Sequence, residues 1–373
     1  MPPPELLQRT FFEDASRIEV GLPLGDVLGA LHPGGVFPLV EDPRRSGGCC
    51  IVGMMVLRGA DSAWRPERLE EDLPSALHQS GGWCFDVDGV SGSWPISGGN
   101  AVDAYRLALQ YGVMDAVLAG AATVSREGMV AGARPGHLWQ PYAPLSWPSL
   151  AAHRELLEPA IAALRRDWQE RGLLSERRWP AQIAVTAGGS PGLLDARIFH
   201  DRHPDGTAIE AWLLTSEAGA GRLRESARKK GLRIDDRLLV TSPPGRPAEL
   251  DVAGVPKLLR DRLDVRLAEH DGGALSLGAF LAAGAIAQLN LSLMRRRSVR
   301  DVIAASPRLG EEERALVLGS WKGRAQLFPI GAMEEGKLER AWQPVYGLVE
   351  EGPQAEAVVV TLDVRSRRRA PAE

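Results

Sequence analysis

Short runs of apolar residues alternate along the chain with longer segments in which apolar residues recur every three or four positions. The short runs are typical of strands buried on both faces of a sheet, and the longer segments are typical of amphipathic helices. The pattern predicts strands at 49–57, 85–90, 116–120, 181–186, 209–216, 238–240, 265–269, 288–293 and 356–363. It predicts helices at 101–110, 156–168, 218–230, 274–283 and 311–318, and another around 258–259. This alternation favours an α/β fold in which helices flank a sheet.

The chain divides into one large domain with an addition at each end. A proline-rich start, scattered glycines and a turn-rich break at 42–48 predict an N-terminal extension over residues 1–47. The α/β domain then covers residues 48–364, without a repeat or a long low-complexity linker. A basic tail follows at 365–373, and we expect it to be solvated.

Composition narrows the class of function. The net charge of -4 gives no basic face for nucleic acid. No export signal opens the chain, and its most apolar run, at 278–289, is too short to span a bilayer, so we expect a cytoplasmic protein without a membrane partner. The three cysteines, Cys49, Cys50 and Cys84, form neither a zinc motif nor a disulfide framework, and the histidines form no metal motif. The sequence predicts no metal site.

A pair of glycines follows the predicted strand at 265–269. Gly272 and Gly273 precede the helix that begins at Ala274, so the backbone can approach a ligand there without an intervening Cβ atom. The unpaired N–H groups at the start of such a helix attract a phosphate group. The motif therefore favours a dinucleotide site, although a glycine turn without a ligand fits the motif alone equally well.

Hydroxyl groups follow two further strands. Gly120 ends a strand and Thr123 lies three residues later, which suits a second approach to a dinucleotide or an ordinary helix cap by Thr123. Thr215 and Ser216 stand before the basic helix, where they suit a ribose 2′-phosphate. The basic residues at 228–230 of that helix are more typical of a solvated face.

Five segments carry a family resemblance by their order in the chain: 86–89, 93–97, 115–124, 185–199 and 269–289. Together they resemble the dihydrofolate-reductase-like superfamily, and within it the pyrimidine reductases of riboflavin biosynthesis. The resemblance implies a dihydrofolate-reductase-like fold, with a mixed, mostly parallel sheet flanked by helices. It also implies an NADPH-dependent reductase that works as a homodimer. Such an enzyme transfers hydride to an imine-like carbon of a small heterocyclic substrate, a pyrimidine or a pterin-like ring.

The same resemblance assigns roles to residues at matching positions. It implies Glu127, beside the nicotinamide, and Asp88 as catalytic residues. It implies substrate contacts from Ser93, Trp94, Tyr111, Arg134 and Glu269, with Arg134 binding a substrate phosphate. It implies cofactor contacts from Gly120, Thr123, Thr215, Ser216, Asp271, Gly272, Gly273 and Ala274.

Several departures from the family pattern leave the chemistry open. His270 and Asp271 separate Glu269 from the glycines, so either Glu269 or Asp271 could take the acidic role. Tyr111 stands where many members have arginine, and Gln288 falls in the place of their Asp-Glu pair. The alternative function is a catalytically silent, nucleotide-binding homologue that acts through dimerisation or partner contact. A third hypothesis places a flavin where the nicotinamide would be.

Overall fold

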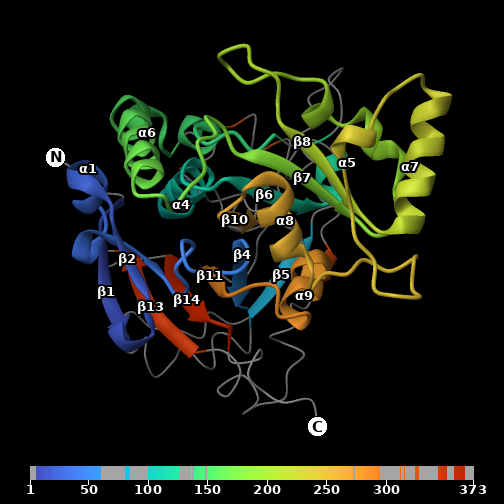
Figure 1. Ribbon diagram of the computed structural model, residues 1–373. Helices are drawn as coiled ribbons and strands as arrows, with labels where there is room; N and C mark the ends of the chain where they lie inside the picture. Colours follow the sequence, from blue (N-terminus) through green and yellow to red (C-terminus); the bar gives the residue numbers. More distant parts are fainter. Residues whose placement is uncertain are drawn as a thin grey trace, which may run out of the picture.

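A twisted sheet runs through the molecule and carries helices on both faces (Figure 1). This computed structural model describes residues 6–59, 80–84, 100–126, 136, 138–147, 149–271, 274–294, 311, 315, 324–326, 343–350 and 357–365. In these residues the strands are β1 (Gln8–Glu13), β2 (Val20–Pro23), β3 (Val36–Leu39), β4 (Cys50–Gly59), β5 (Ser80–Cys84), β6 (Ala116–Gly120), β7 (Ala181–Thr186), β8 (Ala211–Thr215), β9 (Leu238–Val240), β10 (Leu267–His270), β11 (Gln288–Met294), β12 (Arg324–Gln326), β13 (Gln343–Glu350) and β14 (Ala357–Asp363). The α-helices are α1 (Gly25–Gly29), α4 (Ala101–Gly112), α5 (Ala121–Arg126), α6 (Arg154–Glu170), α7 (Glu217–Lys229), α8 (Val255–Leu263) and α9 (Ala274–Ala282).

The strand order of the main sheet is β1-β13-β14-β11-β4-β10-β6-β7-β8-β9. Every neighbouring pair from β11 to β9 is parallel, whereas the pairs from β1 to β11 are antiparallel. Strands β2 and β3 form a separate antiparallel pair. The expectation of an α/β fold with a mixed, mostly parallel sheet flanked by helices is therefore confirmed.

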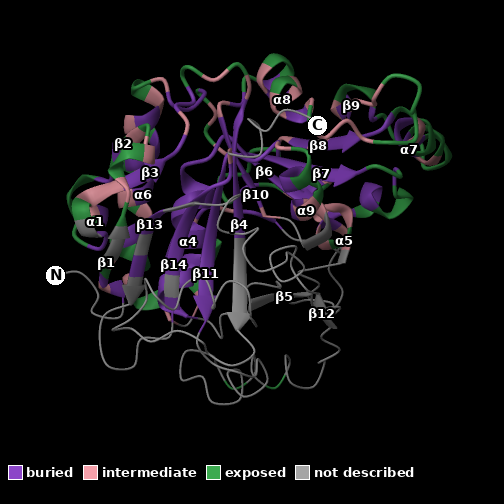
Figure 2. Ribbon diagram, turned by 90° about the horizontal axis from the view of Figure 1, so that it is seen from below, coloured by how far each residue is buried: buried purple, intermediate pink, exposed green. Residues whose placement is uncertain are grey.

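Side chains of successive strand residues point to opposite faces, and this alternation divides the core into layers. In β10, Leu267 packs with α4 and α6, whereas Ala268 packs with α8 and α9. Helix α7 joins the face of α4, where both helices pack against β6 to β8. Figure 2 shows α4 buried along its length, because the sheet lies on one side of it while α6 and the N-terminal extension lie on the other.

The helices and strands predicted from the apolar pattern are present within a few residues of their expected bounds wherever the structure describes them. Asn100 caps α4 as its position suggests, because its side chain accepts hydrogen bonds from the N–H groups of Val102 (2.9 Å) and Asp103 (3.2 Å). The strand expected at 85–90 and most of the helix expected at 311–318 lie outside the described residues.

The N-terminal extension joins the main sheet and its core. Strand β1 pairs with β13, and the β2–β3 pair packs leucine side chains against α4 and α6. Gln288 of β11 forms two hydrogen bonds with the extension. Its Oε1 accepts from the N–H of Val40 (3.1 Å), and its Nε2 donates to the carbonyl of Pro38 (3.1 Å). A glutamate at this position would lack the Nε2 donor, so the contact with Pro38 needs the amide of Gln288.

The first residue of the basic tail is held in place. Arg365 donates to the carboxylates of Asp363 (3.1 Å) and Glu19 (2.5 Å). Its side chain is 23% exposed, which corrects the expectation of a solvated residue at this position. The remainder of the tail lies outside the described residues.

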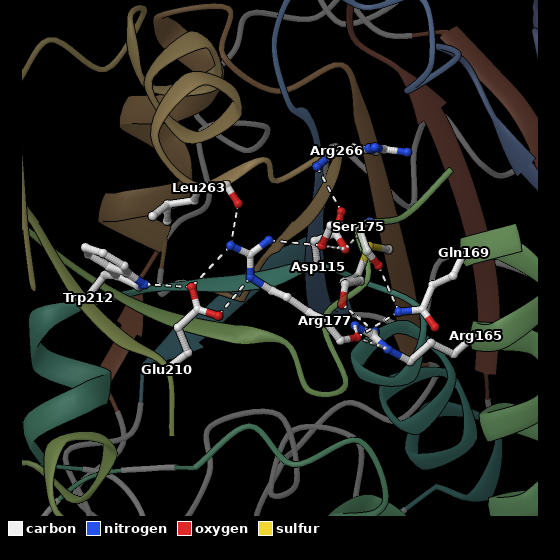
Figure 3. Close-up of polar contacts among 10 residues, drawn as sticks. Asp115, Arg165, Gln169, Ser175, Arg177, Glu210, Trp212, Leu263 and Arg266 are labelled. Carbon is white, nitrogen blue, oxygen red and sulfur yellow. Dashed lines mark hydrogen bonds and ion pairs between the residues drawn. The ribbon is translucent and has the colours of Figure 1, made fainter. Parts of the chain in front are cut away.

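A buried carboxylate joins the amino ends of the central strands (Figure 3). Asp115, immediately before β6, accepts hydrogen bonds from the N–H (2.9 Å) and hydroxyl (2.7 Å) of Ser175. It also accepts from the N–H groups of Arg266 (2.9 Å) and Leu267 (3.4 Å), at the start of β10. One fully buried side chain therefore fixes the positions of β6, β10 and the segment that follows α6.

Three further side chains extend this amino-edge network to α6 and β8. Arg165 donates to the carbonyls of Gly112 (3.0 Å) and Met114 (2.8 Å) at the end of α4. Gln169 donates to the carbonyl of Arg177 (2.8 Å), whose guanidinium pairs with Glu210 (2.8 Å) before β8. The amino edge of the sheet is thus occupied by internal polar contacts.

Among the described residues, no helix is both long and apolar enough to cross a membrane.

Candidate functional site

The neighbouring parallel strands β4, β10 and β6 end at one edge of the sheet, opposite the amino-edge network. The chain passes from β4 through α4 to β6, and from β10 through α9 to β11 on the far side of β4. These two connections leave in opposite directions and cover opposite faces of the sheet. Open α/β sheets bind their ligands at the carboxyl ends of strands where connections diverge in this way. The side chains at the end of β10 therefore form the candidate site.

Glu269 is a fully buried carboxyl group on the α4 face of β10. Neither of its carboxyl oxygens has a hydrogen-bond partner in the part of the chain that the structure describes. Burial raises the pKa of Glu269 well above its usual value, the charge of Asp271 raises it further, and Arg106 partly opposes the rise. The carboxyl group therefore keeps its proton to a higher pH than an exposed glutamate does, and in that form it offers one O–H donor and an acceptor oxygen. A buried polar group without a partner destabilises a fold, so its presence here points to a ligand.

Asp271 lies two residues after Glu269, at the point where β10 ends. Its Oδ2 accepts hydrogen bonds from the hydroxyl of Tyr111, on α4, and from Nε1 of Trp139 (2.8 Å). Both donors are buried, and Trp139 is fully enclosed in the core between α4, β6 and β7. The Asp271 side chain is only partly buried. Two core residues therefore fix a carboxylate at the accessible edge of the sheet.

Arg106 of α4 brings a buried positive charge to the same face. Its Nη1 donates to the hydroxyl of Ser292 on β11 (2.6 Å). Burial lowers the pKa of Arg106 to about 10, although the charges of Asp103 and Glu269 act in the opposite direction. The guanidinium thus stays charged at neutral pH and balances part of the negative charge carried by the carboxyl groups around it.

His270 points to the opposite face of the strand, toward α9. It is fully buried, its ring lies 4.5 Å from the ring of Phe280, and its Nε2 is 3.1 Å from the hydroxyl of Ser276. Burial lowers the pKa of His270 to about 4, so the imidazole is neutral at physiological pH. The two residues inserted before the glycines therefore have separate environments, His270 in the apolar layer and Asp271 at the site.

His270 makes the fold sensitive to acid, which gives a first prediction. Below pH 6.5 the unfolded chain binds a proton at this histidine, whereas the folded chain stays neutral down to about pH 4. Protonation in that window therefore favours unfolding, by about 1.4 kcal/mol per pH unit. Urea unfolding of His270→Gln should show a shallower loss of stability between these pH values than the unsubstituted chain. Equal slopes for the His270→Gln variant and the unsubstituted chain would refute the assignment.

Gly120 places the starts of two helices side by side. Helix α5 begins immediately after it, and a Cβ atom added to Gly120 would lie 3.4 Å from the Cβ of Ser276, in the first turn of α9. Thr123 lies inside the first turn of α5 with a partly buried side chain, so the alternative of a helix cap by Thr123 is wrong. Ala274 is the first residue of α9. Gly120 thus lies against the first turn of the helix that begins at the predicted cofactor residue Ala274.

Thr215 and Ser216 lie farther along the sheet, where the start of α7 is closed by hydrogen bonds within the chain. The hydroxyl of Thr215 donates to the carbonyl of Thr186 (2.6 Å), and the hydroxyl of Ser216 donates to the carbonyl of Ala187 (2.7 Å). The first N–H groups of α7 also have acceptors, including the Ser216 hydroxyl, which caps the helix. A 2′-phosphate bound by these two hydroxyls would have to displace existing hydrogen bonds.

The remaining predicted site residues lie outside the described part of the chain. They are Asp88, Ser93, Trp94, Glu127, Arg134, Gly272 and Gly273. Among the residues that the structure does describe, no group of three or more His, Cys, Asp or Glu side chains could hold a metal ion.

Arg106 and Trp139 belong to the site but were missed by sequence reasoning. The sequence did contain an indication of Arg106. Asp103 and Arg106 are charged residues one turn apart in a helix that is otherwise largely apolar. A helix buried on all sides rarely carries such a pair without a function. The sequence contained no indication of Trp139, because its contact with Asp271 joins segments that are far apart in the chain.

Comparison with known proteins finds reductases among solved structures. A pyrimidine reductase-like protein of Corynebacterium diphtheriae is 13% identical, with 85% of this chain and 92% of that chain covered and a TM-score of 0.43. Acinetobacter baumannii RibD is 12% identical, with 85% and 58% covered and a TM-score of 0.36. The riboflavin biosynthesis reductase Rib7 of Saccharomyces is 9% identical, with 86% and 91% covered and a TM-score of 0.34. No family model and no curated protein matches the chain.

The names of these structures describe reductases, the class of enzyme that the sequence resemblance implies.

Proposed function

We propose that this protein is a reductase that uses a nicotinamide dinucleotide, NADPH by the family resemblance, to transfer hydride to an imine-like carbon of a small heterocyclic substrate. The observation that carries the proposal is Glu269, a buried carboxyl group with a raised pKa and no hydrogen-bond partner among the described residues, two positions before the fixed carboxylate of Asp271. Reduction of a C=N bond needs a proton at nitrogen as well as hydride at carbon. A buried acid with a raised pKa at the ligand-binding edge of the sheet suits that need.

The residues at the starts of α5 and α9 fit the diphosphate of such a cofactor. Gly120 has no Cβ atom, and the two helix starts meet beside it. Helix starts and glycines are the features that bind diphosphate groups at strand ends. Thr123, Ala274 and the predicted turn at Gly272 and Gly273 would complete this part of the site. When bound, the nicotinamide would supply the hydride, and the protein would supply orientation and a proton.

The fit is poorer at the predicted 2′-phosphate contacts. The hydroxyls of Thr215 and Ser216 are already engaged with backbone carbonyls. Selection of NADPH over NADH by these hydroxyls therefore stays a prediction that depends on rearrangement at α7. Comparing the Kd of NADPH with that of NADH tests it directly, and equal affinities would contradict it.

Each protein group has a defined task in the proposed reaction. Glu269 holds the proton that the substrate nitrogen receives as hydride reaches the carbon, and solvent returns a proton to Glu269 after product release. Asp271 and Tyr111 orient the substrate from the α4 side. The resemblance adds Glu127 and Asp88 as catalytic groups, and Ser93, Trp94 and Arg134 as substrate contacts. Homodimer formation remains part of the same proposal.

Gly272→Val gives the direct test of the cofactor assignment. The added side chain would meet the diphosphate or forbid the turn, so the affinity for NADPH should fall by at least about tenfold. Quenching of NADPH fluorescence measures it. The matched control is Gly221→Val. Gly221 is an exposed residue of α7, and a Cβ atom added to it would meet no atom within 4 Å. Unchanged affinity in Gly272→Val would reject the assignment.

Turnover against a panel of cyclic imines and aminopyrimidines separates the enzyme from its alternative. Oxidation of NADPH that depends on one of these compounds supports the reductase. Tight NADPH binding without any oxidation would favour the catalytically silent homologue, and a yellow preparation would favour a bound flavin.

A further inference from the structure

Helix α6 lies on the opposite side of the molecule from α7 (Figure 1), and a hollow of about 1160 Å³ runs along it. Pro159 and Ala162 of α6 line one wall, and Pro204, in the short hairpin at 202–208, lines the other. Arg165, which belongs to the amino-edge network, also lines it. The hollow is therefore separate from the carboxyl edge of the sheet, where the candidate site lies.

Trp179 holds the hairpin wall of the hollow in place. Its Nε1 donates to the carboxylate of Asp205 (2.9 Å), and its ring stacks on the ring of His203 at a distance of 4.8 Å. The ring of Tyr142 lies edge-on to that of Trp179, with 6.0 Å between the ring centres. Tyr142 and Trp179 both line the hollow and are partly exposed. The hollow thus presents a preformed surface with an apolar centre.

Most of the charged side chains that line the hollow have partners within the chain. Glu158 pairs with Arg154 (2.8 Å), and Asp205 pairs with Arg178 (3.0 Å). The guanidinium of Arg165 donates to backbone carbonyls. These groups are therefore not available to balance a further charge.

The two remaining charged residues of the hollow have opposite signs. Glu155 and Arg166 lie on the same face of α6, about three turns and about 16 Å apart along the helix. Both are exposed, and neither forms an ion pair or a hydrogen bond with a residue in the part of the chain that the structure describes. The apolar centre of the hollow is thus flanked by an unpaired carboxylate at one end and an unpaired guanidinium at the other.

A second copy of α6 fits this surface when the two helices run antiparallel. A two-fold axis through the middle of α6, between Pro159 and Ala162, would place Glu155 of each copy opposite Arg166 of the partner subunit. A parallel arrangement would instead place like charges opposite each other. Each helix would enter the hollow of the other copy, as the ridges of one helix pack into the grooves of another. The surface is therefore complementary to itself in both shape and charge.

We propose that two copies of this chain associate through the α6 hollow, with their α6 helices antiparallel about a two-fold axis. The reciprocal charges favour a second copy over a different protein, since one surface supplies both members of each ion pair. Contacts among Pro159, Ala162 and Trp179 stabilise the centre, and the two ion pairs set the direction of the helices. The proposal rests on the homodimer included in the proposed function, and it names the face that forms this homodimer.

Sedimentation equilibrium of the full-length protein measures the Kd of the dimer, and the unsubstituted chain should dimerise at micromolar concentration. Glu155→Arg and Arg166→Glu would each place like charges opposite each other at two positions across the axis, so each should raise the Kd at least about tenfold. The double variant restores opposite charges with reversed polarity. Its Kd should return to within about threefold of the unsubstituted value.

Two further variants separate this interface from a general effect of charge. Glu225→Arg, which reverses an exposed charge on α7, is the matched control and should leave the Kd within about twofold. Ala162→Arg fills the apolar centre and should raise the Kd at least about tenfold, while urea unfolding stays cooperative. A monomer at all concentrations up to the solubility limit, single reversals with an unchanged Kd, or a double variant no tighter than the single ones would each overturn the proposal.

The outcome is separable from that of the proposed reductase, because NADPH titration of the same preparations measures cofactor binding independently. If the protein is a dimer whose Kd is unchanged by the α6 substitutions, the homodimer forms through another face and only this proposal fails. If NADPH fails to bind but the dimer depends on Glu155 and Arg166, the reductase proposal fails and the α6 interface stands.

Discussion

Asp115→Ala should lower the free energy of unfolding by about 4 kcal/mol. The substitution leaves several buried donors without an acceptor, among them the N–H groups of Ser175 and Arg266, and each such loss costs about 1–3 kcal/mol. Domains of this kind are stable by only about 5–15 kcal/mol, so the change removes a large part of the total. Urea unfolding followed by circular dichroism measures it.

Two further variants make this result interpretable. Asp261→Ala removes an exposed carboxylate that pairs with Lys257, and its effect should stay within about 0.5 kcal/mol. Should Asp115→Ala fail to fold, Asp115→Asn keeps one acceptor oxygen and should show a smaller, measurable loss. A loss below about 1 kcal/mol in Asp115→Ala would show that the amino-edge network does not hold the sheet together.

Glu269→Leu should make the protein more stable and far less active. Leucine fills the space of a buried polar group that has no hydrogen-bond partner among the described residues, so the free energy of unfolding should rise by about 1–3 kcal/mol at pH 7. Loss of a general acid should lower kcat by a factor of about 100 to 10,000. Both effects follow from the isolation of this carboxyl group.

The stability gain depends on pH in a defined direction. The pKa of Glu269 is raised in the folded protein above its ordinary value of 4.5, so the folded chain keeps a proton that the unfolded chain releases. Stability of the unsubstituted protein therefore falls as pH rises above 4.5, and the advantage of Glu269→Leu grows over that range. Below that pH the titration contributes nothing to the difference. A gain that is independent of pH would mean that Glu269 is charged in the fold.

Glu225→Gln is the control for the Glu269 experiments. Glu225 is an exposed carboxylate on α7 that pairs with Lys229, so its loss should alter stability little and kcat not at all. Glu269→Gln gives a second test of function, because the amide matches the shape of the acid but cannot supply its proton. Normal turnover in Glu269→Gln would reject the proposed proton donor.

Local patterns in the sequence were sufficient to predict the central elements. Buried parallel strands such as 116–120 and 181–186 appear as uninterrupted apolar runs, and Asn100 indicates the start of α4 through its capping side chain. The alternation of residues in β10 also places Glu269 and Asp271 on one face and His270 on the other. These features depend on neighbours in the chain.

The parts that sequence reasoning missed depend on contacts between distant segments. Strand β1 pairs with β13, near the other end of the chain, and its own residues give no indication of that partner. The Asp271 contact with Trp139 and the Gln288 contact with Val40 are of the same kind. The hydroxyls of Thr215 and Ser216 are a similar case, since they donate to carbonyls at the end of the neighbouring strand β7, about thirty residues earlier in the chain.

The position of β10 has a consequence for synthesis of the protein on the ribosome. β4 and β6 are separated in the sheet by β10, which is made only after residue 266. Until then no strand joins the two earlier strands to each other, and the edge of each that will face β10 has no native partner. The central sheet can close only when the last third of the chain has emerged, and β1 waits longer still for β13. Growing chains of this protein thus carry open strand edges for most of translation, and such edges are prone to aggregate.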